Sequence, residues 1–242
     1  MLALLPMLQL KNLNKSFNEK VIDNLTLAIP SGQVFGFLGP NGAGKTTTVK
    51  MIVGLLFPDS GSIKLDKLPA GSLAAKRLTG FMPESPQFYS HLSAKEVLEF
   101  VGTIFGLERP LLADRTKTLL QKVGLADSAK LSVRQFSKGM LQRLSFAVAL
   151  INEPKLLVLD EPLDGLDPLG RLDFKKLLLN LKKTGVTIFL SSHILADVAE
   201  ICDSVSIINR GRILKSGTPK ALTGSRFVSL EEMFVETIRQ DG

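Results

Sequence analysis

Residues 34–47 read VFGFLGPNGAGKTT, and this stretch decides the fold. Val34 to Leu38 is a short apolar run typical of a buried strand, and Thr46 to Leu55 reads as a helix. Residues 39–46 between them match the pattern G-x-x-x-x-G-K-[ST] in full. A chance glycine turn before a helix is the alternative interpretation, but a chance turn would not explain why a buried strand directly precedes the loop. The order strand, glycine-rich loop, helix predicts nucleotide binding on an α/β fold.

The residue types in this loop suit phosphate binding. Glycines let backbone N–H groups curl around phosphates without a Cβ in the way, and the following helix N-terminus adds a positive dipole. Lys45 places a charge on the β- and γ-phosphates, and the Thr46 hydroxyl is a magnesium ligand. The predicted ATP-binding residues here are Gly39, Pro40, Asn41, Gly42, Ala43, Gly44, Lys45, Thr46 and Thr47.

Two carboxylates follow a second apolar run. Leu156 to Leu159 reads as a strand covered on both faces, and Asp160-Glu161-Pro162 comes directly after it. Such a strand delivers Asp160 beside the phosphate loop, where it can hold Mg²⁺, and places Glu161 on the γ-phosphate side. Glu161 can then polarise the attacking water as a general base. Two acidic residues that merely open an exposed loop are the weaker reading, because the upstream run is so apolar.

Strand patterns occupy both ends of the chain. Leu8 to Lys15 and the alternating stretch 25–29 precede the phosphate loop. Val186 to Leu190 is another buried strand, and 204–209 with 212–215 predicts a hairpin around Arg210-Gly211. Asp167 and Pro168 fit the N-cap and first position of an intervening helix.

The middle of the chain, about 85–151, is predicted to be a helical insert. Ser93 and Glu96 form a capping box before an apolar stripe, and a second helix stops at Gly124. A third helix begins near Ser137 and ends before Pro154. The core of this single domain, 1–242, then comprises about 1–84 and 152–226, and a last helix covers about 229–240.

Composition limits the function classes. The net charge of +7 could serve polyphosphate, nucleic acid or an anionic membrane surface, but a solvated surface with some excess lysine is the preferred interpretation. There is no run of basic residues, no Trp and one Tyr, so no nucleic-acid partner is expected. Cys202 alone excludes a disulfide framework and is expected in the core. Neither a signal peptide nor a membrane-spanning run is recognised.

Two further motifs distinguish between families with a phosphate loop. Phe136-Ser137-Lys138-Gly139-Met140 precedes the Asp160 strand by about one helix, and Ser191-Ser192-His193 follows the 186–190 strand. With Gly165-Leu166-Asp167, they make the chain resemble the nucleotide-binding subunits of ATP-binding cassette (ABC) transporters, from about residue 8 to 235. The resemblance implies an ATPase with a RecA-like P-loop core on a mixed or parallel sheet, an N-terminal antiparallel β subdomain and an inserted α-helical subdomain.

The resemblance also implies residue roles. Phe17 would stack on adenine, the 39–46 loop would be the Walker A loop, and Asp160 and Glu161 would be Walker B and the catalytic base. Lys45 and His193 would act with Glu161 in catalysis, with His193 contacting the γ-phosphate. Ser137 and Gly139 in the signature motif would bind the γ-phosphate held by a partner subunit, so the site would need two subunits. Simple helix capping by Ser137 is compatible with this role.

Two positions depart from the family pattern. The usual signature is L-S-G-G-Q, whereas here Lys138 and Met140 accompany the retained Ser137 and Gly139. The Q-loop position carries Glu84 in place of glutamine. A carboxylate can still ligate Mg²⁺, so Thr46, Asp160 and Glu84 are the predicted metal ligands, and Gln87 is a weaker alternative to Glu84.

The partners implied are a separate membrane permease and a second copy of this chain or a related cassette. The subunit would lie at the cytoplasmic face of the membrane, where Phe88, Tyr89 or His91 could meet the permease or simply pack. The C-terminal stretch 229–234, Pro83-Glu84 and Ser-Lys-Gly-Met resemble subunits of export systems. A soluble ABC protein acting on ribosomes or nucleic acid, and a binding module without turnover, are the alternatives. The transported substrate is not encoded here.

Overall fold

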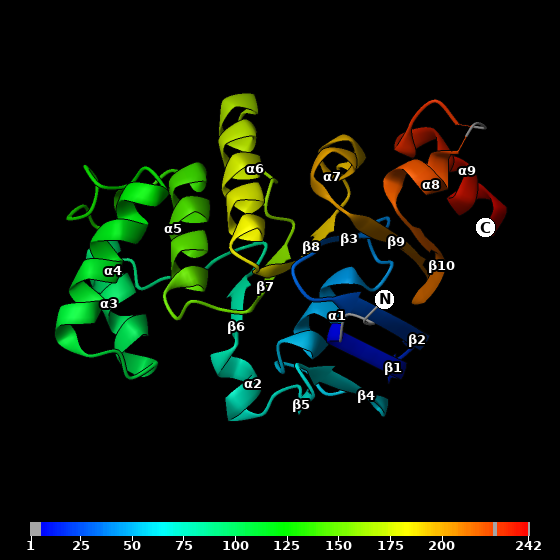
Figure 1. The fold of residues 1–242 in the computed structure, drawn as a ribbon, viewed down its shortest axis with the longest axis horizontal. Helices are drawn as coiled ribbons and strands as arrows, with labels where there is room; N and C mark the ends of the chain where they lie inside the picture. The colour runs from blue at the N-terminus through cyan, green and yellow to red at the C-terminus, as the bar shows by residue number, and fades with distance from the viewer. Residues whose placement is uncertain (1–5, 225–226, 242) are drawn as a thin grey trace.

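The computed structural model describes residues 6–224 and 227–241, which form two sheets with helices around them (Figure 1). The strands are β1 (Pro6–Ser16), β2 (Lys20–Pro30), β3 (Val34–Leu38), β4 (Ser60–Leu65), β5 (Leu68–Pro69), β6 (Thr79–Met82), β7 (Leu156–Asp160), β8 (Thr187–Ser192), β9 (Ser204–Asn209) and β10 (Arg212–Gly217). The helices are α1 (Lys45–Ile52), α2 (Leu73–Arg77), α3 (Ala94–Ile104), α4 (Arg109–Lys122), the 3-10 turn η1 (Val133–Gln135), α5 (Lys138–Leu150), α6 (Pro168–Lys183), α7 (Leu195–Ile201), α8 (Pro219–Thr223) and α9 (Leu230–Asp241).

The larger sheet has the strand order β10-β9-β3-β8-β7-β6. β6, β7, β8, β3 and β9 run parallel, and only the β9–β10 hairpin is antiparallel. Every residue of β3, β7 and β8 is buried, as the apolar runs predicted. Because these strands are parallel, their carboxyl ends meet at one edge of the sheet, where the phosphate loop begins.

The smaller sheet is antiparallel, with the order β2-β1-β4-β5. β2 alternates buried and exposed residues from Leu25 to Ile29, which confirms the half-buried strand expected there. Its buried side chains share one apolar core with Phe35, Val158 and Phe189 of the larger sheet. α1 lies between the two sheets in Figure 1 and contacts β2, β7 and β8, so the phosphate loop is anchored on a packed base.

The helices α3, α4 and α5 gather at one end of the molecule, beyond the edge strand β6 (Figure 1). Their apolar side chains are continuous with the core of the large sheet, since Leu98 and Leu144 belong to the same buried cluster as Leu157 and Leu190. The helical insert is therefore packed onto the sheet. The boundaries 85 and 151 stay a prediction.

Several helices and strands begin or end at residues other than those that the sequence predicted. α1 stops at Ile52, short of Leu55, because Gly54 turns the chain at a φ of 71°. β8 begins one residue later than expected and extends through Ser192. The capping box of α3 is present in full. At the start of α9, Ser229 Oγ accepts from the Glu232 N–H at 3.2 Å, and the Glu232 carboxylate accepts from the Val228 N–H at 2.9 Å.

Two further observations bear on earlier expectations. Cys202 is buried, and burial raises the pKa of its thiol, which agrees with a core residue. Over residues 6–224 and 227–241, no helix combines the length and apolar character needed to cross a bilayer.

Candidate nucleotide-binding site

The phosphate loop joins β3 to α1 in a conformation that requires glycine. Gly44 is the N-cap of α1 and has a φ of 104°, so a side chain there would be strained. A Cβ added at Gly39 would lie 2.5 Å from the Ile208 carbonyl oxygen. These glycines let the loop lie against β9 and leave the backbone N–H groups at the start of α1 free of side-chain caps, as an anion site needs.

Lys45 is held inside the loop. Its side chain is 6% exposed, and its Nζ donates to the carbonyl oxygens of Gly39 at 2.8 Å and Pro40 at 3.3 Å. The same ammonium forms an ion pair with Glu161 Oε1 at 3.3 Å. A buried cation is therefore fixed between the phosphate loop and the carboxylate that follows β7.

Asp160 ends β7 directly opposite Ser191 of β8. Ser191 Oγ donates to Asp160 Oδ1 at 2.5 Å and accepts from the Glu161 N–H at 3.0 Å. Burial raises the pKa of Asp160, while hydrogen bonds from Ser191 and from Thr46 favour its charged form. The Walker B carboxylate thus lies next to the hydroxyl at the start of α1.

This pairing fits a magnesium ion. Thr46 and Asp160 offer hydroxyl and carboxylate oxygens, the donor type that Mg²⁺ prefers, and burial disfavours the charged form of Asp160, which a bound cation would stabilise. Within the described part of the chain, no three His, Cys, Asp or Glu residues cluster as a metal site. Mg²⁺ takes one or two carboxylates and completes its shell with substrate phosphates and water.

Glu161 is held in an unusual backbone conformation. Its φ is 48°, in the left-handed region that non-glycine residues seldom adopt. Its Oε2 accepts from the His193 N–H at 3.2 Å and lies 2.9 Å from His193 Nδ1. The carboxylate is only 9% exposed, so Lys45 and His193 fix it from two sides. Such strain at a buried carboxylate is typical of a functional site.

These residues surround one pocket of about 580 Å³. Its lining consists of Val21, Pro40, Asn41, Gly42, Gly44, Lys45, Thr46, Thr47, Glu84, Glu161, Asp164 and His193. The structure thus brings together most of the predicted nucleotide, catalytic and metal-binding residues. Gly39 and Ala43 shape the loop behind the pocket.

Six predicted residues are absent from this lining: Gly39, Ala43 and Asp160, which belong to the phosphate loop and the end of β7, and Phe17, Ser137 and Gly139. Phe17 is 61% exposed, and the Lys15 ammonium lies 5.5 Å from the centre of its ring. Ser137 and Gly139 begin α5, where Ser137 Oγ accepts from the Met140 N–H at 3.3 Å. Gln87, the alternative to Glu84, lines a different pocket.

Sequence reasoning missed two residues of the site. Ser191 was noted as part of a motif without a role, yet it joins Asp160 to the Glu161 backbone. Its place as the last but one residue of a strand parallel to β7 was the available signal. Asp164 lines the pocket and lies three residues after Glu161, so its spacing alone gave no indication.

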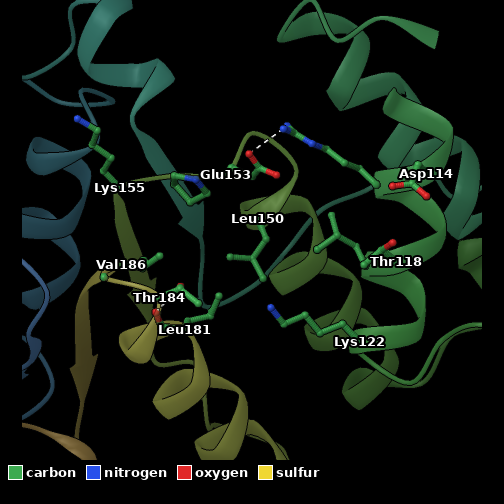
Figure 2. Close-up of a pocket in the computed structure, with 13 residues that line it drawn as sticks. Asp114, Thr118, Lys122, Leu150, Glu153, Lys155, Leu181, Thr184 and Val186 are labelled. Atoms are coloured by element: carbon green, nitrogen blue, oxygen red, sulfur yellow. Dashed lines mark hydrogen bonds and ion pairs between the residues drawn. The ribbon is translucent and has the colours of Figure 1, made fainter. Parts of the chain in front are cut away.

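A second pocket, of about 530 Å³, lies between α4, the end of α5 and the end of α6 (Figure 2). Figure 2 shows Leu150, Leu181 and Val186 on its apolar side, and the dashed line from Glu153 marks an ion pair with Arg115 at 2.7 Å. None of its lining residues belongs to the phosphate loop or to the carboxylate pair. The nucleotide site is therefore the pocket at the carboxyl edge of the sheet.

Comparison with known proteins decides the family. The ABC transporter family profile matches residues 22–164, which span the phosphate loop and the carboxylate pair. The chain belongs to the ABC transporter family. A solved structure of an ATP-binding subunit of an ABC transporter superposes with a TM-score of 0.89 and 32% identity, covering 96% of this chain and 99% of that one. The predicted ABC nucleotide-binding subunit and its P-loop α/β fold are confirmed.

Two curated ABC relatives show the range of lengths. An uncharacterised ABC transporter ATP-binding protein of Synechocystis is 43% identical over 86% of this chain, which spans only 60% of that protein. A Nod factor export ATP-binding protein of Cupriavidus metallidurans is 39% identical, covering 90% of this chain and 73% of its own length. The ABC ATPase domain is common to all of them, and some members extend beyond it.

Proposed function

We propose that this ABC subunit binds and hydrolyses ATP to power a separate membrane permease, in the direction of export, through ATP-driven dimerisation. The contact of Lys45, Glu161 and His193 across the phosphate loop carries the proposal. A cation, a carboxylate and an imidazole in mutual contact beside the loop are what a bound γ-phosphate and an attacking water would need, and this supports the proposal.

Hydrolysis needs a base and a fixed phosphate. The loop amides and Lys45 would hold the phosphates. Glu161 would take a proton from the attacking water while the water oxygen bonds to the γ-phosphorus. The bond to the ADP oxygen breaks with the electron pair staying on ADP, and the proton passes from Glu161 to solvent. His193 orients Glu161 through its backbone N–H and its ring. A magnesium ion held by Thr46, Asp160 and Glu84 would neutralise phosphate charge.

The position of the signature motif, away from the pocket of its own subunit, supports dimerisation. Ser137 begins α5 at an exposed helix N-terminus and does not line the pocket of its own subunit. Ser137 Oγ and the first amides of α5 suit an anion. A second subunit would supply that anion as the γ-phosphate on its Walker A loop, and each subunit would complete the other's site.

The permease contact is proposed for an apolar surface beside the Q-loop. Tyr89, Phe100 and Ile104 are large apolar side chains with exposures of 63%, 50% and 69%. Tyr89 and Phe100 also line a pocket of about 540 Å³ that contains Pro83, the neighbour of Glu84. Apolar surfaces of this kind mark interaction sites. A permease segment in this pocket would move with Glu84 at the cytoplasmic face of the membrane.

Export as the direction rests on sequence features and one relative. The stretch 229–234 and the Pro83-Glu84 and Ser-Lys-Gly-Met motifs resemble those of export systems, and the Cupriavidus relative is named for Nod factor export.

Co-purification tests the transporter function. Tagged Glu161→Gln would be pulled from native membranes in mild detergent with Mg-ATP, with a tagged chain carrying Lys45→Ala as the matched control. A polytopic membrane protein recovered at near-equal amounts with Glu161→Gln is the expected result. Recovery of ribosomal or nucleic-acid-bound proteins from the soluble fraction would replace the transporter proposal with the soluble alternative.

The role of Glu161 has its own test. Glu161→Gln should bind ATP as the unchanged chain does and lose about 10²- to 10⁴-fold in turnover, because the general base is removed. Nucleotide binding and phosphate release are measured on the same preparations. Turnover at the rate of the unchanged chain would assign the base elsewhere.

A further inference from the structure

The structure shows where the unusual lysine of the signature motif goes. Lys138 is the first residue of α5, and its Nζ lies 3.0 Å from Asp164 Oδ2. The stem of the side chain crosses Gly165, where an added Cβ would lie 2.4 Å from Lys138 Cε. Gly165 has a φ of 72° and leaves room for this crossing. The start of α5 is therefore tied to the loop that follows β7.

Asp164 connects this tie to the subunit's own nucleotide site. It lines the pocket together with Glu161 and His193. Its N–H donates to the Glu161 carbonyl oxygen at 3.1 Å, so the two residues belong to one tight turn. The adjacent ammonium of Lys138 holds the pKa of the Asp164 carboxyl below its usual range, which favours the charged carboxylate.

Leu166 of the same loop lies close to the start of α5. A Cβ added at Gly139 would lie 3.8 Å from Leu166 Cδ2, and Leu166 itself is buried. The start of α5 and the loop 161–167 therefore lie side by side, and the Lys138–Asp164 ion pair joins them.

We propose that Lys138 is a positioning residue that couples the two nucleotide sites of the dimer through Asp164. The inference rests on the proposed composite site. A helix N-terminus favours anions and opposes a cation, so Lys138 needs an acidic partner there. A γ-phosphate arriving from the other subunit would compete with Asp164 for the lysine. Once Asp164 is released from the lysine, the turn that carries Glu161 could change its position in the subunit's own site.

The exposure of the pair makes the proposal testable. Lys138 and Asp164 have side-chain exposures of 62% and 40%, and ion pairs so exposed contribute little to folding. Lys176 and Asp173 on α6 form a comparably exposed pair, at 3.9 Å with exposures of 64% and 57%, and serve as the matched control. A change confined to the first pair would therefore report coupling rather than folding.

The experiment measures ATP hydrolysis by the full chain over a range of ATP concentrations. The unchanged chain should show a Hill coefficient near two, because two sites close together. Lys138→Gln and Asp164→Asn should each bring the coefficient close to one, and the double variant should match the single ones. Lys138→Arg keeps the charge and should restore cooperativity, whereas Lys176→Gln should leave the curve unchanged.

The outcomes of this experiment distinguish the coupling proposal from the proposed ATPase function. Cooperative hydrolysis that persists in Lys138→Gln and Asp164→Asn would overturn the coupling and leave the ATPase proposal standing. Additive losses in the double variant would also overturn it, since the residues would then act independently. An unchanged chain that hydrolyses no ATP would contradict the proposed function itself, and the coupling with it.

Discussion

At the scale of single residues, the site depends on one buried hydroxyl. Ser191 Oγ serves Asp160 and the Glu161 N–H at once, and its side chain is fully buried. It fixes the spacing of the two carboxylates that the proposed chemistry uses. A serine in this position therefore fixes the geometry of the two carboxylates, although it does not itself line the pocket.

Ser191→Ala should lower the free energy of unfolding by about 1–3 kcal/mol, because two buried polar groups lose a partner. Urea unfolding measures the change. Ser204 is half-buried, with its Oγ 3.4 Å from Gln33 Oε1, and Ser204→Ala should stay within about 0.5 kcal/mol of the unchanged chain. Equal effects of the two substitutions would contradict the role given to Ser191.

The chemistry of single residues was the most predictable part of the molecule. Lys45, Thr46, Asp160 and Glu161 each follow a local pattern that leaves little freedom in where the side chain can lie. Asp164 and Lys138 are separated by 26 residues, and nothing local announces their ion pair. The adenine-stacking role of Phe17 was inferred from the family resemblance alone. Phe17 does not line the pocket, so this role stays a prediction.

At the scale of elements, α3 begins with a reciprocal cap. Ser93 Oγ accepts from the Glu96 N–H at 3.3 Å, and Glu96 Oε2 accepts from the Ser93 N–H at 2.8 Å. Ser93→Ala should cost about 0.5–2 kcal/mol of folding free energy, measured by urea unfolding. Ser62→Ala, at an exposed position of β4, is the control and should have little effect. If both behave alike, the cap does not stabilise the insert.

The edge strand β6 is fitted closely against α5. A Cβ at Gly80 would lie 2.0 Å from the Ala149 carbonyl oxygen and 2.9 Å from Pro154 Cγ. Gly80→Ala should therefore force β6 and the end of α5 apart and destabilise the fold by about 1–3 kcal/mol. At Gly139 the nearest atom would be at 3.8 Å, so Gly139→Ala should not lower the unfolding midpoint in urea. An unchanged midpoint for Gly80→Ala would contradict this packing.

Element boundaries show why the sequence predicts some features and not others. The apolar runs of β3, β7 and β8 were recognisable because strands buried on both faces need them. The short β5 and α2 have two and five residues, too few for a periodic pattern. α1 was predicted too long because the apolar residues continue past Gly54, which ends the helix.

At the scale of the whole molecule, long-range pairing set the limit of prediction. β6 pairs with β7 from Thr79 to Met82, although the entire helical insert separates them in the chain. The helical patterns of residues 85–151 supplied the expectation of an insert, and the parallel pairing of β6 with β7 explains it. Both ends of the insert return to neighbouring strands, so the Q-loop residue Glu84 comes just before the insert and lines the nucleotide pocket.

The insert could both bind the permease and support the nucleotide site, and substitutions can separate these two roles. Tyr89 and Phe100 form an edge-to-face aromatic pair with ring centres 6.2 Å apart, and both are mostly exposed. Neither lines the nucleotide pocket. A partner that covers them would bury large aromatic surface, the kind of contact that contributes most to binding. Their loss should affect permease binding and leave the chemistry of ATP untouched.

The double substitution Tyr89→Ala and Phe100→Ala, made in the tagged Glu161→Gln chain, should lower recovery of the membrane protein at least about 10-fold, because aromatic anchors at interfaces are commonly worth 2 kcal/mol or more. In the otherwise unchanged chain it should leave basal ATP hydrolysis within about 2-fold. Val235 is 45% exposed on α9, a helix that Figure 1 shows at the end of the molecule opposite α3, α4 and α5, so Val235→Ala should change neither measurement. Full recovery of the membrane protein by the double variant would place the permease on another face. Lost hydrolysis would instead mean that the aromatic pair supports the site through Glu84.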